Sequence, residues 1–280
     1  IDLYKKSGEH IGDKIAFSSV KKNIVYNKEQ IEVIDSIKSS LKLKKFSSNL
    51  LHGVTGSGKT EIFIESIKTV MEMGKSSIVL IPEISLTPQI AGRFKDVFGE
   101  GVALWHSQLT KAQRAKTWDS INTGESKIVI GARSAIFSPI KNLGLIIVDE
   151  EHDASYKQES PSPRYHARDV AIMRGKIENC SVVLSSATPS LETFYNYKVK
   201  KHNYLSLPKR YGVAVYPKVK VVDLIDESRE TGKFNIIISG TLQQKIEERL
   251  NNNEQVLLIQ NRRGHSPTVK CSDCGNIVMC

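Results

Sequence analysis

The segment from residue 53 to residue 60 carries the clearest chemistry in this sequence. Glycines in a loop let backbone N–H groups curl around a phosphate, and the start of a following helix adds a partial positive charge. Lys59 would then reach the β- and γ-phosphates of ATP, and Thr60 would place its hydroxyl on Mg²⁺. A chance glycine turn is the alternative. The segment matches the pattern G-x-x-x-x-G-K-[ST] and comprises Gly53, Val54, Thr55, Gly56, Ser57, Gly58, Lys59 and Thr60, all of which we predict to bind ATP.

An acidic group follows the apolar run at 145–148. Asp149 would hold Mg²⁺ through its water shell, and Glu150 would polarise the attacking water as a general base. A short acidic cluster is usually a solvated turn. Its position after a buried strand and downstream of the glycine loop favours the catalytic interpretation.

A third polar group lies at 185–190, also at the end of an apolar run. Ser186 and Thr188 could bond the acidic group and sense the γ-phosphate. Ser/Thr-Pro clusters are common turns, so this prediction depends on the order of the three groups along the chain.

The elements that must position these groups alternate along the chain. Apolar runs predict strands at 49–52, 77–81, 101–105, 127–131, 144–148 and 181–185, and helical spacing predicts helices at 26–43 (with Asn27 as N-cap), 60–73, 87–97 and 110–121. Such alternation predicts an α/β fold with a mostly parallel sheet covered by helices on both faces. The ligand loops should then lie at the carboxyl ends of the strands.

Composition narrows the class of protein. The 280 residues carry a net charge of +10, which favours a polyanionic partner, a nucleic acid first and an acidic membrane second, or reflects many solvated lysines. Neither a run of about 20 apolar residues nor a signal peptide is present, so we expect a cytoplasmic protein without membrane contact. The chain begins at Ile1 and stops within a cysteine cluster, and we interpret it as a piece of a longer protein.

The pattern also predicts how the chain divides. We expect a linker or the end of a preceding module at 1–22, the nucleotide-binding domain at 23–192, a basic connector at 193–235 and the start of a second α/β domain at 236–280. The connector prediction depends on a run of lysines without an acidic residue at 193–222. A helix at about 240–252 and a strand at 255–260 should open the second domain.

Taken in order, GVTGSGKT, DEEH and SATPS resemble the DExH-box helicases of superfamily 2. The segments at 81–89, 131–137, 149–171 and 261–267 further resemble the bacterial replication-restart helicases. The resemblance implies RecA-like domains and a 3′-to-5′ DNA helicase that acts at stalled forks and D-loops in primosome assembly. It also implies forked or single-stranded DNA, restart proteins and single-strand-binding protein as partners, near the nucleoid.

The resemblance implies roles for further residues. Gln30 would read the adenine edge, while Arg133 and Ser134 would contact the DNA backbone. Tyr165 and Arg168 lie in a segment of aromatics and cations that would bind DNA and signal its presence to the acidic group. The alternatives are an exposed helix glutamine, a surface arginine and tyrosines packed on the core.

Four cysteines complete the inventory of candidates. Cys271, Cys274 and Cys280 have the spacing of an incomplete zinc site, whereas the isolated Cys180 is expected to be a buried apolar residue. By resemblance, the fourth zinc ligand and an arginine finger lie outside the sequence, so the chain alone should hydrolyse ATP poorly. A double-strand DNA translocase and a nucleotide-switched DNA-binding module remain as alternatives, and Glu150 argues against the switch.

Overall fold

The computed structural model describes residues 25–82, 88–212, 217–232, 237–259, 269–270 and 277–278. The chain forms two compact units that divide between residues 215 and 216, and each is described by itself. Among the helices of the described residues, none is long and apolar enough to cross a membrane.

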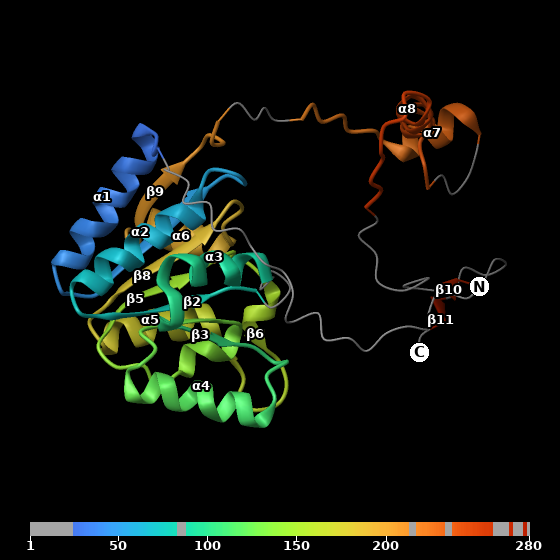
Figure 1. Cartoon of the computed structure of the whole chain (residues 1–280). Helices are drawn as coiled ribbons and strands as arrows, with labels where there is room; N and C mark the ends of the chain where they lie inside the picture. Colours follow the sequence, from blue (N-terminus) through green and yellow to red (C-terminus); the bar gives the residue numbers. More distant parts are fainter. Residues whose placement is uncertain are drawn as a thin grey trace. The chain divides into compact units, whose positions relative to one another are not determined.

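The first unit is built on a seven-stranded sheet in the order β3-β4-β2-β5-β8-β1-β9, and every pairing in it is parallel (Figure 1). Its strands are β1 (Ser47–Gly53), β2 (Ser76–Leu80), β3 (Val102–Trp105), β4 (Ile128–Gly131), β5 (Leu143–Val148), β8 (Ser181–Ser186) and β9 (Asn203–Leu207). The six predicted strands are confirmed. All of their carboxyl ends meet at one edge of the sheet, which is where ligand loops are expected.

Helices connect the strands and cover the sheet. They are α1 (Lys28–Lys42), α2 (Lys59–Glu72), α3 (Pro88–Phe98), α4 (Lys111–Thr123), α5 (Ala167–Ile177) and α6 (Leu191–Lys198). Shorter elements are the 3₁₀ helices η2 (Gly99–Gly101), η3 (Arg133–Phe137) and η4 (Ala154–Tyr156), and a hairpin of β6 (Lys157–Gln158) and β7 (Tyr165–His166). Asn27 caps α1 as predicted, in a reciprocal capping box with Gln30.

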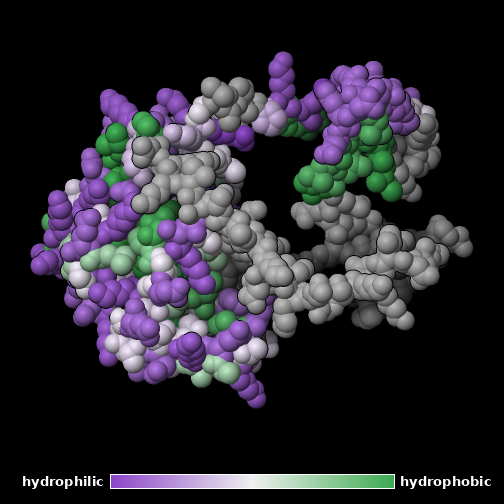
Figure 2. All heavy atoms as spheres, in the orientation of Figure 1, coloured by the Kyte–Doolittle hydropathy of each residue, from purple (hydrophilic) through white to green (hydrophobic). Residues whose placement is uncertain are grey.

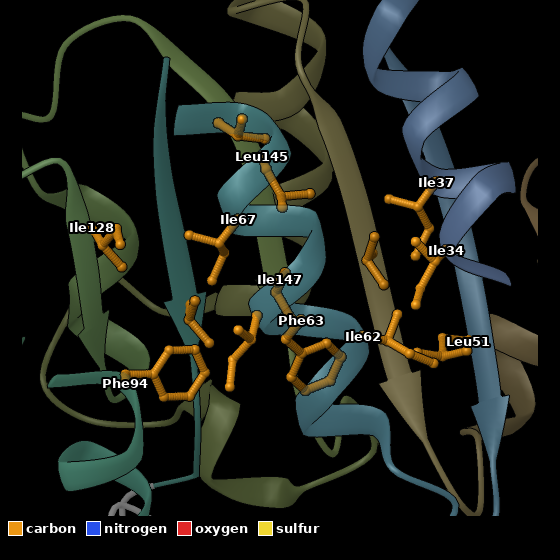
Figure 3. Packing of buried hydrophobic residues seen from close by; sticks show 14 of the residues in the cluster. Ile34, Ile37, Leu51, Ile62, Phe63, Ile67, Phe94, Ile128, Leu145 and Ile147 are labelled. Atoms are coloured by element: carbon orange, nitrogen blue, oxygen red, sulfur yellow. The ribbon is translucent and has the colours of Figure 1, made fainter. Parts of the chain in front are cut away.

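Two hydrophobic clusters explain why the sheet is covered on both faces. Leu51 and Ile147 lie in the cluster under α1, α2 and α3, whereas the neighbouring Leu50 and Ile146 lie in the cluster under α4 and α5. Figure 3 shows Ile34, Ile37, Ile62, Phe63, Ile67 and Phe94 from the helices packed against strand residues of the first cluster. Because successive strand residues point to opposite faces, continuous apolar runs give a sheet that is buried on both sides. The predicted fold class is confirmed.

The first unit extends beyond the predicted boundary at residue 192. β9 pairs in register with β1 over Asn49–Gly53, and the first unit continues to residue 215. The basic connector predicted at 193–235 therefore contains α6 and an edge strand. This strand is hard to predict from the sequence, because it lies in a lysine-rich segment and has no continuous apolar run. Of Asn203–Leu207 only Leu205 and Leu207 are buried, as expected for an edge strand.

The second unit contains α7 (Leu224–Thr231), α8 (Gly240–Asn251) and an antiparallel pair of β10 (Val269–Lys270) and β11 (Ile277–Val278). The helix predicted at 240–252 is confirmed. The strand predicted at 255–260 is wrong over its described residues 255–259, which form no regular element and expose Leu257 and Ile259 by 84% each. An apolar run forms a strand only when a neighbouring strand satisfies its backbone, and in this part of the described chain none does. On the face drawn in Figure 2 hydrophobic atoms gather on the second unit, whereas the same face of the first unit is mainly hydrophilic.

Candidate active site

The glycine loop lies where β1 ends and α2 begins. Gly56 has φ +79° and Gly58 has φ +87°, a left-handed conformation that side chains disfavour. A Cβ atom at Gly58 would lie 2.4 Å from Nε2 of Gln30, so a side chain here would force the carboxamide of Gln30 to shift. Gly58 is also the N-cap of α2 and brings no side chain to the first N–H groups of that helix. Those N–H groups are therefore available to an anion, and the loop fits a phosphate.

The loop forms one wall of a cavity of about 510 Å³. Lys59 and Thr60 line it, as do Asp149 and Glu150 at the end of β5. The volume is in the range of small-molecule and cofactor sites. The predicted phosphate and magnesium ligands thus share one cavity at the carboxyl edge of the sheet.

Lys59 forms two contacts inside this cavity. Its Nζ donates to the carbonyl oxygen of Gly53 at 3.0 Å and lies 3.5 Å from Oε1 of Glu150. The lysine side chain is 10% exposed and the glutamate side chain 32% exposed. The cation and the predicted general base therefore neutralise each other, and an arriving phosphate has to compete with Glu150 for Lys59.

Asp149 lies in an environment that disfavours its charge. Burial, and then the neighbouring charge of Glu150, raise the pKa of Asp149 to about 6, although the charge of Lys59 lowers it. A carboxylate of this kind gains most when a cation neutralises it. The arrangement fits a divalent ion, for which the hydroxyl of Thr60 is a second candidate ligand in the same cavity.

Glu150 adopts a left-handed conformation with φ +46°. Such a conformation costs a non-glycine residue roughly 1–3 kcal/mol and is concentrated at functional sites. The backbone around it is held by Asp149, whose Oδ1 accepts from the N–H of Glu150 at 3.1 Å. The hydroxyl of the fully buried Tyr156 also donates to the carbonyl of Asp149 at 2.6 Å. This turn fixes the direction in which the side chain of Glu150 leaves the backbone.

The segment that follows β5 and the polar group at 185–190 are in contact, as the sequence predicted, and the contact is made by His152. Nδ1 of His152 lies 2.8 Å from Oγ of Ser186, and the same hydroxyl accepts from the N–H of Thr188 at 2.9 Å. Nδ1 of His152 is also 3.7 Å from Oε2 of Glu150. A short chain of polar contacts thus joins Thr188 to Glu150, the predicted general base. The sensing role of Ser186 and Thr188 stays a prediction.

A family comparison agrees with this arrangement. The model of the family "DEAD/DEAH box helicase" matches residues 27–196, which hold the glycine loop, the acidic group and the group after β8. The chain belongs to the DEAD/DEAH box helicase family. Members of this family use ATP and Mg²⁺, which agrees with the shared cavity of Lys59, Thr60 and Asp149.

Individual curated proteins and solved structures are also similar to this chain. The chain is 46% identical over 252 residues to the replication restart protein PriA of Bacillus subtilis, covering 90% of this chain and 31% of that protein. It is 40% identical to PriA of Rickettsia prowazekii, covering 95% and 40%. RecG bound to a three-way DNA junction (TM-score 0.52, 22% identity, 69% and 25% covered) and the DUF1998 helicase MrfA (TM-score 0.53, 16% identity, 86% and 36% covered) share the fold. The chain spans about a third of the length of the curated relatives it matches.

One residue that was predicted to contact DNA has a partner within the protein. The side chain of Arg168 is 12% exposed, and its Nη1 lies 3.2 Å from Oε2 of Glu151, which is fully buried. The carboxylate of Glu151 also accepts from the N–H of Ser190 at 2.7 Å and from Oγ1 of Thr193 at 2.8 Å. In this structure the guanidinium of Arg168 therefore neutralises a buried carboxylate behind the turn at Asp149 and Glu150, and its contact with a DNA phosphate stays a prediction. The ion pair cannot be read from the sequence, because only the fold brings Arg168 and Glu151 together.

The other predicted DNA-binding residues lie at the carboxyl edge of β4 and in the hairpin. The guanidinium of Arg133 lies over the ring of Tyr165 at 5.8 Å and donates to the carbonyl of Lys157 at 2.9 Å. Oγ of Ser134 accepts from Nε1 of Trp105 at 3.1 Å. The structure brings Arg133 and Tyr165 together as a stacked pair, and their contact with DNA stays a prediction.

Gln30 is placed in the cavity wall but is already engaged. Its Oε1 accepts from the N–H of Asn27 at 3.0 Å, and its Nε2 donates to the carbonyl of Ser57 at 2.9 Å. The residue is 1% exposed. Gln30 therefore joins the start of α1 to the glycine loop, and reading of adenine would have to use its remaining donor and acceptor.

The cysteine predictions have different outcomes. Cys271, Cys274 and Cys280 lie outside the described residues. Within the part of the chain that the structure describes, His, Cys, Asp and Glu form no group suited to a metal ion. Cys180 is buried as predicted, and burial raises its pKa to about 12.

Sequence reasoning missed three residues that line the cavity, Glu61, Arg93 and Tyr211. Arg93 from α3 pairs with Glu61, the residue after Thr60. Tyr211 reaches the cavity from the segment after β9. The sequence offered one indication of a role for Tyr211, its aromatic side chain. Nothing in the sequence shows that β9 returns the chain to the side of β1 and so brings Tyr211 to the cavity.

Proposed function

We propose that this chain is the ATP-hydrolysing part of a 3′-to-5′ DNA helicase that restarts replication at stalled forks and D-loops. The observation that carries the proposal is the cavity in which Lys59, Asp149 and Glu150 meet the left-handed glycine loop. The similarity to PriA over 90% of the chain supports the assignment to replication restart. ATP hydrolysis would drive translocation along forked or single-stranded DNA in the cytosol of a bacterium, at the nucleoid.

The residues of the cavity divide the chemistry among them. The N–H groups of the glycine loop and Lys59 would bind the phosphates, and Thr60 and Asp149 would hold Mg²⁺. Bound Mg²⁺ supplies charge neutralisation of the phosphate oxygens. Glu150 orients a water and accepts its proton once Lys59 has turned from Glu150 toward the phosphates. Because the left-handed backbone fixes Glu150, the base is preorganised.

Coupling to DNA would pass through the polar contacts behind the cavity. Ser186 touches His152, which lies beside Glu150, so a shift at the end of β8 changes the surroundings of the base. The stacked pair of Arg133 and Tyr165 offers a cation and an aromatic ring to a single strand. We propose that the contacts of Ser186 and the pair of Arg133 and Tyr165 act only when DNA is bound.

The remaining assignments concern the rest of the chain. We propose that residues 236–280, which include α8, begin a second RecA-like domain and that Cys271, Cys274 and Cys280 contribute thiolates to a Zn²⁺ site. Restart proteins and single-strand-binding protein are the proposed protein partners. An arginine finger from the second domain would complete catalysis, so the chain alone should turn over slowly.

The test uses the full-length protein and two lysines of the same helix. Lys59→Ala should abolish DNA-stimulated ATP hydrolysis and strand displacement on forks. Lys68→Ala, which removes an exposed lysine paired with Glu65, should leave both at the wild-type level. Unwinding of forks but not of blunt duplexes is expected. Movement along blunt duplex without strand displacement would instead identify a double-strand translocase, and wild-type turnover by folded Lys59→Ala would refute the active site.

A further inference from the structure

Tyr211 enters the nucleotide cavity from a part of the chain that carries none of the helicase motifs. It lines the same cavity as Gln30, Gly58 and Lys59, four residues after β9 ends. The residue is 49% exposed. It therefore presents a substantial apolar surface beside the phosphate loop.

Two hydrogen bonds hold Tyr211 at opposite ends. Its backbone N–H donates to the carbonyl of Gly56 at 2.8 Å, and its hydroxyl donates to the carbonyl of Val25 at 3.0 Å. The ring thus spans from the tip of the glycine loop to the chain that precedes α1. Both polar ends have partners, so the part of the ring that faces the cavity is purely apolar.

This position matches the place that a base has to take. The loop fixes the phosphates at Gly56–Lys59, and the base then lies away from Lys59, on the side where Gln30 and the start of α1 form the wall. A fixed ring face in a polar cavity gains free energy when a flat aromatic ligand covers it. The carboxamide of Gln30 already bonds Asn27 and Ser57, which leaves stacking as the larger contribution from this wall.

We propose that Tyr211 is the platform on which the base of the nucleotide stacks, and that it is a binding residue rather than a catalytic one. The proposal rests on the proposed function, since it assumes that the loop binds a nucleotide. The hydroxyl of Tyr211 is needed only to hold the ring against Val25. Phenylalanine should therefore replace tyrosine with little loss, whereas a side chain without a ring should not.

The experiment compares ADP with inorganic tripolyphosphate, which has phosphates but no base. Calorimetric titrations use the full-length protein in wild-type, Tyr211→Ala, Tyr211→Leu and Tyr211→Phe forms, with Tyr195→Ala as a matched surface control. Tyr195 is 65% exposed on α6. Stacking of a base on an aromatic ring predicts that Tyr211→Ala weakens ADP binding about tenfold. Tyr211→Leu should weaken it too, and Tyr211→Phe and Tyr195→Ala should stay within about twofold of the wild type.

Tripolyphosphate decides what a loss of affinity means. Every variant keeps the N–H that bonds Gly56, so tripolyphosphate should bind all of them equally. An equal loss for ADP and tripolyphosphate would overturn the platform, because Tyr211 would then only support the loop. Unchanged or tighter ADP binding by Tyr211→Ala would overturn it as well, the latter by showing that the ring obstructs the base. Failure of wild-type protein to bind tripolyphosphate would refute the phosphate loop itself, which is a different failure.

Discussion

Replacing Glu150 with glutamine should separate nucleotide binding from hydrolysis, and it should strengthen the former. Lys59 Nζ lies 3.5 Å from Oε1 of Glu150, so the phosphates must displace this contact. Two unit charges at that separation attract by roughly 5 kcal/mol at an effective dielectric constant of about 20. The glutamate side chain is 32% exposed, so solvent screening and side-chain entropy reduce the net value to about 1 kcal/mol.

A released Lys59 then binds phosphate without competition. A gain of about 1 kcal/mol corresponds to roughly fivefold tighter ATP binding. The same substitution removes the second-largest influence that raises the pKa of Asp149, which also favours Mg²⁺. Hydrolysis should fall by about 10²–10⁴-fold, because glutamine cannot accept the proton of the water.

The assay pairs two measurements on one preparation of the full-length protein. Titration with ATP and Mg²⁺ gives the affinity, and single-turnover hydrolysis gives the rate of the chemical step. Glu178→Gln is the control, since Glu178 is 30% exposed and also ion-paired, with Arg174 at the far end of α5. Affinity that falls together with turnover in Glu150→Gln would refute the competition and make Glu150 a metal ligand or a structural residue.

Further predictions address the neighbouring groups. Lys59→Ala should weaken binding of ATP and of tripolyphosphate alike, as measured by titration, and wild-type affinity for both ligands would exclude its phosphate contact. The pKa of Asp149 is about 6 in the folded chain, and its ordinary value is 3.8. Ionisation of Asp149 therefore lowers the free energy of unfolding by up to about 3 kcal/mol. The full cost is present above pH about 6, and no cost is present below pH about 4. Asp149→Asn should therefore raise the thermal midpoint of the nucleotide-free protein at pH 8, with a smaller gain at pH 5, and a gain independent of pH would contradict the assignment. Arg168→Ala leaves the buried Glu151 without its cation and should lower the thermal midpoint by several °C, about 3 kcal/mol or more, whereas a midpoint at the wild-type value would mean that Arg168 is free to meet DNA. Tyr165→Ala should keep the midpoint and basal rate but reduce DNA stimulation of ATP hydrolysis, and an unchanged stimulation ratio would remove it from the DNA interface.

Local patterns predicted the parts of this fold that depend on neighbours in sequence. The strand at 144–148 and the loop at 53–60 could be predicted because apolar periodicity and glycine spacing are local properties. β9 was missed because an edge strand buries only alternate residues and its partner β1 is about 150 residues away in sequence.

The candidate site shows the same division. Lys59, Asp149 and Glu150 could be assigned from their motifs, and the structure places them in one cavity. The ion pair of Arg168 with Glu151 could not be predicted, because it depends on how closely the start of α5 approaches the end of β5. A cationic residue near an aromatic one in sequence looks the same whether it faces solvent or a buried carboxylate.

The order of three adjacent strands in the sheet has a consequence for side-chain length. β8 lies between β5, which ends just before Asp149 and Glu150, and β1, which ends at the glycine loop. Neighbouring strands are about 4.8 Å apart, so the two loops start from backbones separated by about 10 Å. That gap can admit a phosphate and a hydrated ion, and only long side chains can close it, as Lys59 and Glu150 do at 3.5 Å. An aspartate in place of Glu150 would fall short by one carbon–carbon bond, about 1.5 Å. The width of one intervening strand therefore sets the minimum length of the side chain at position 150.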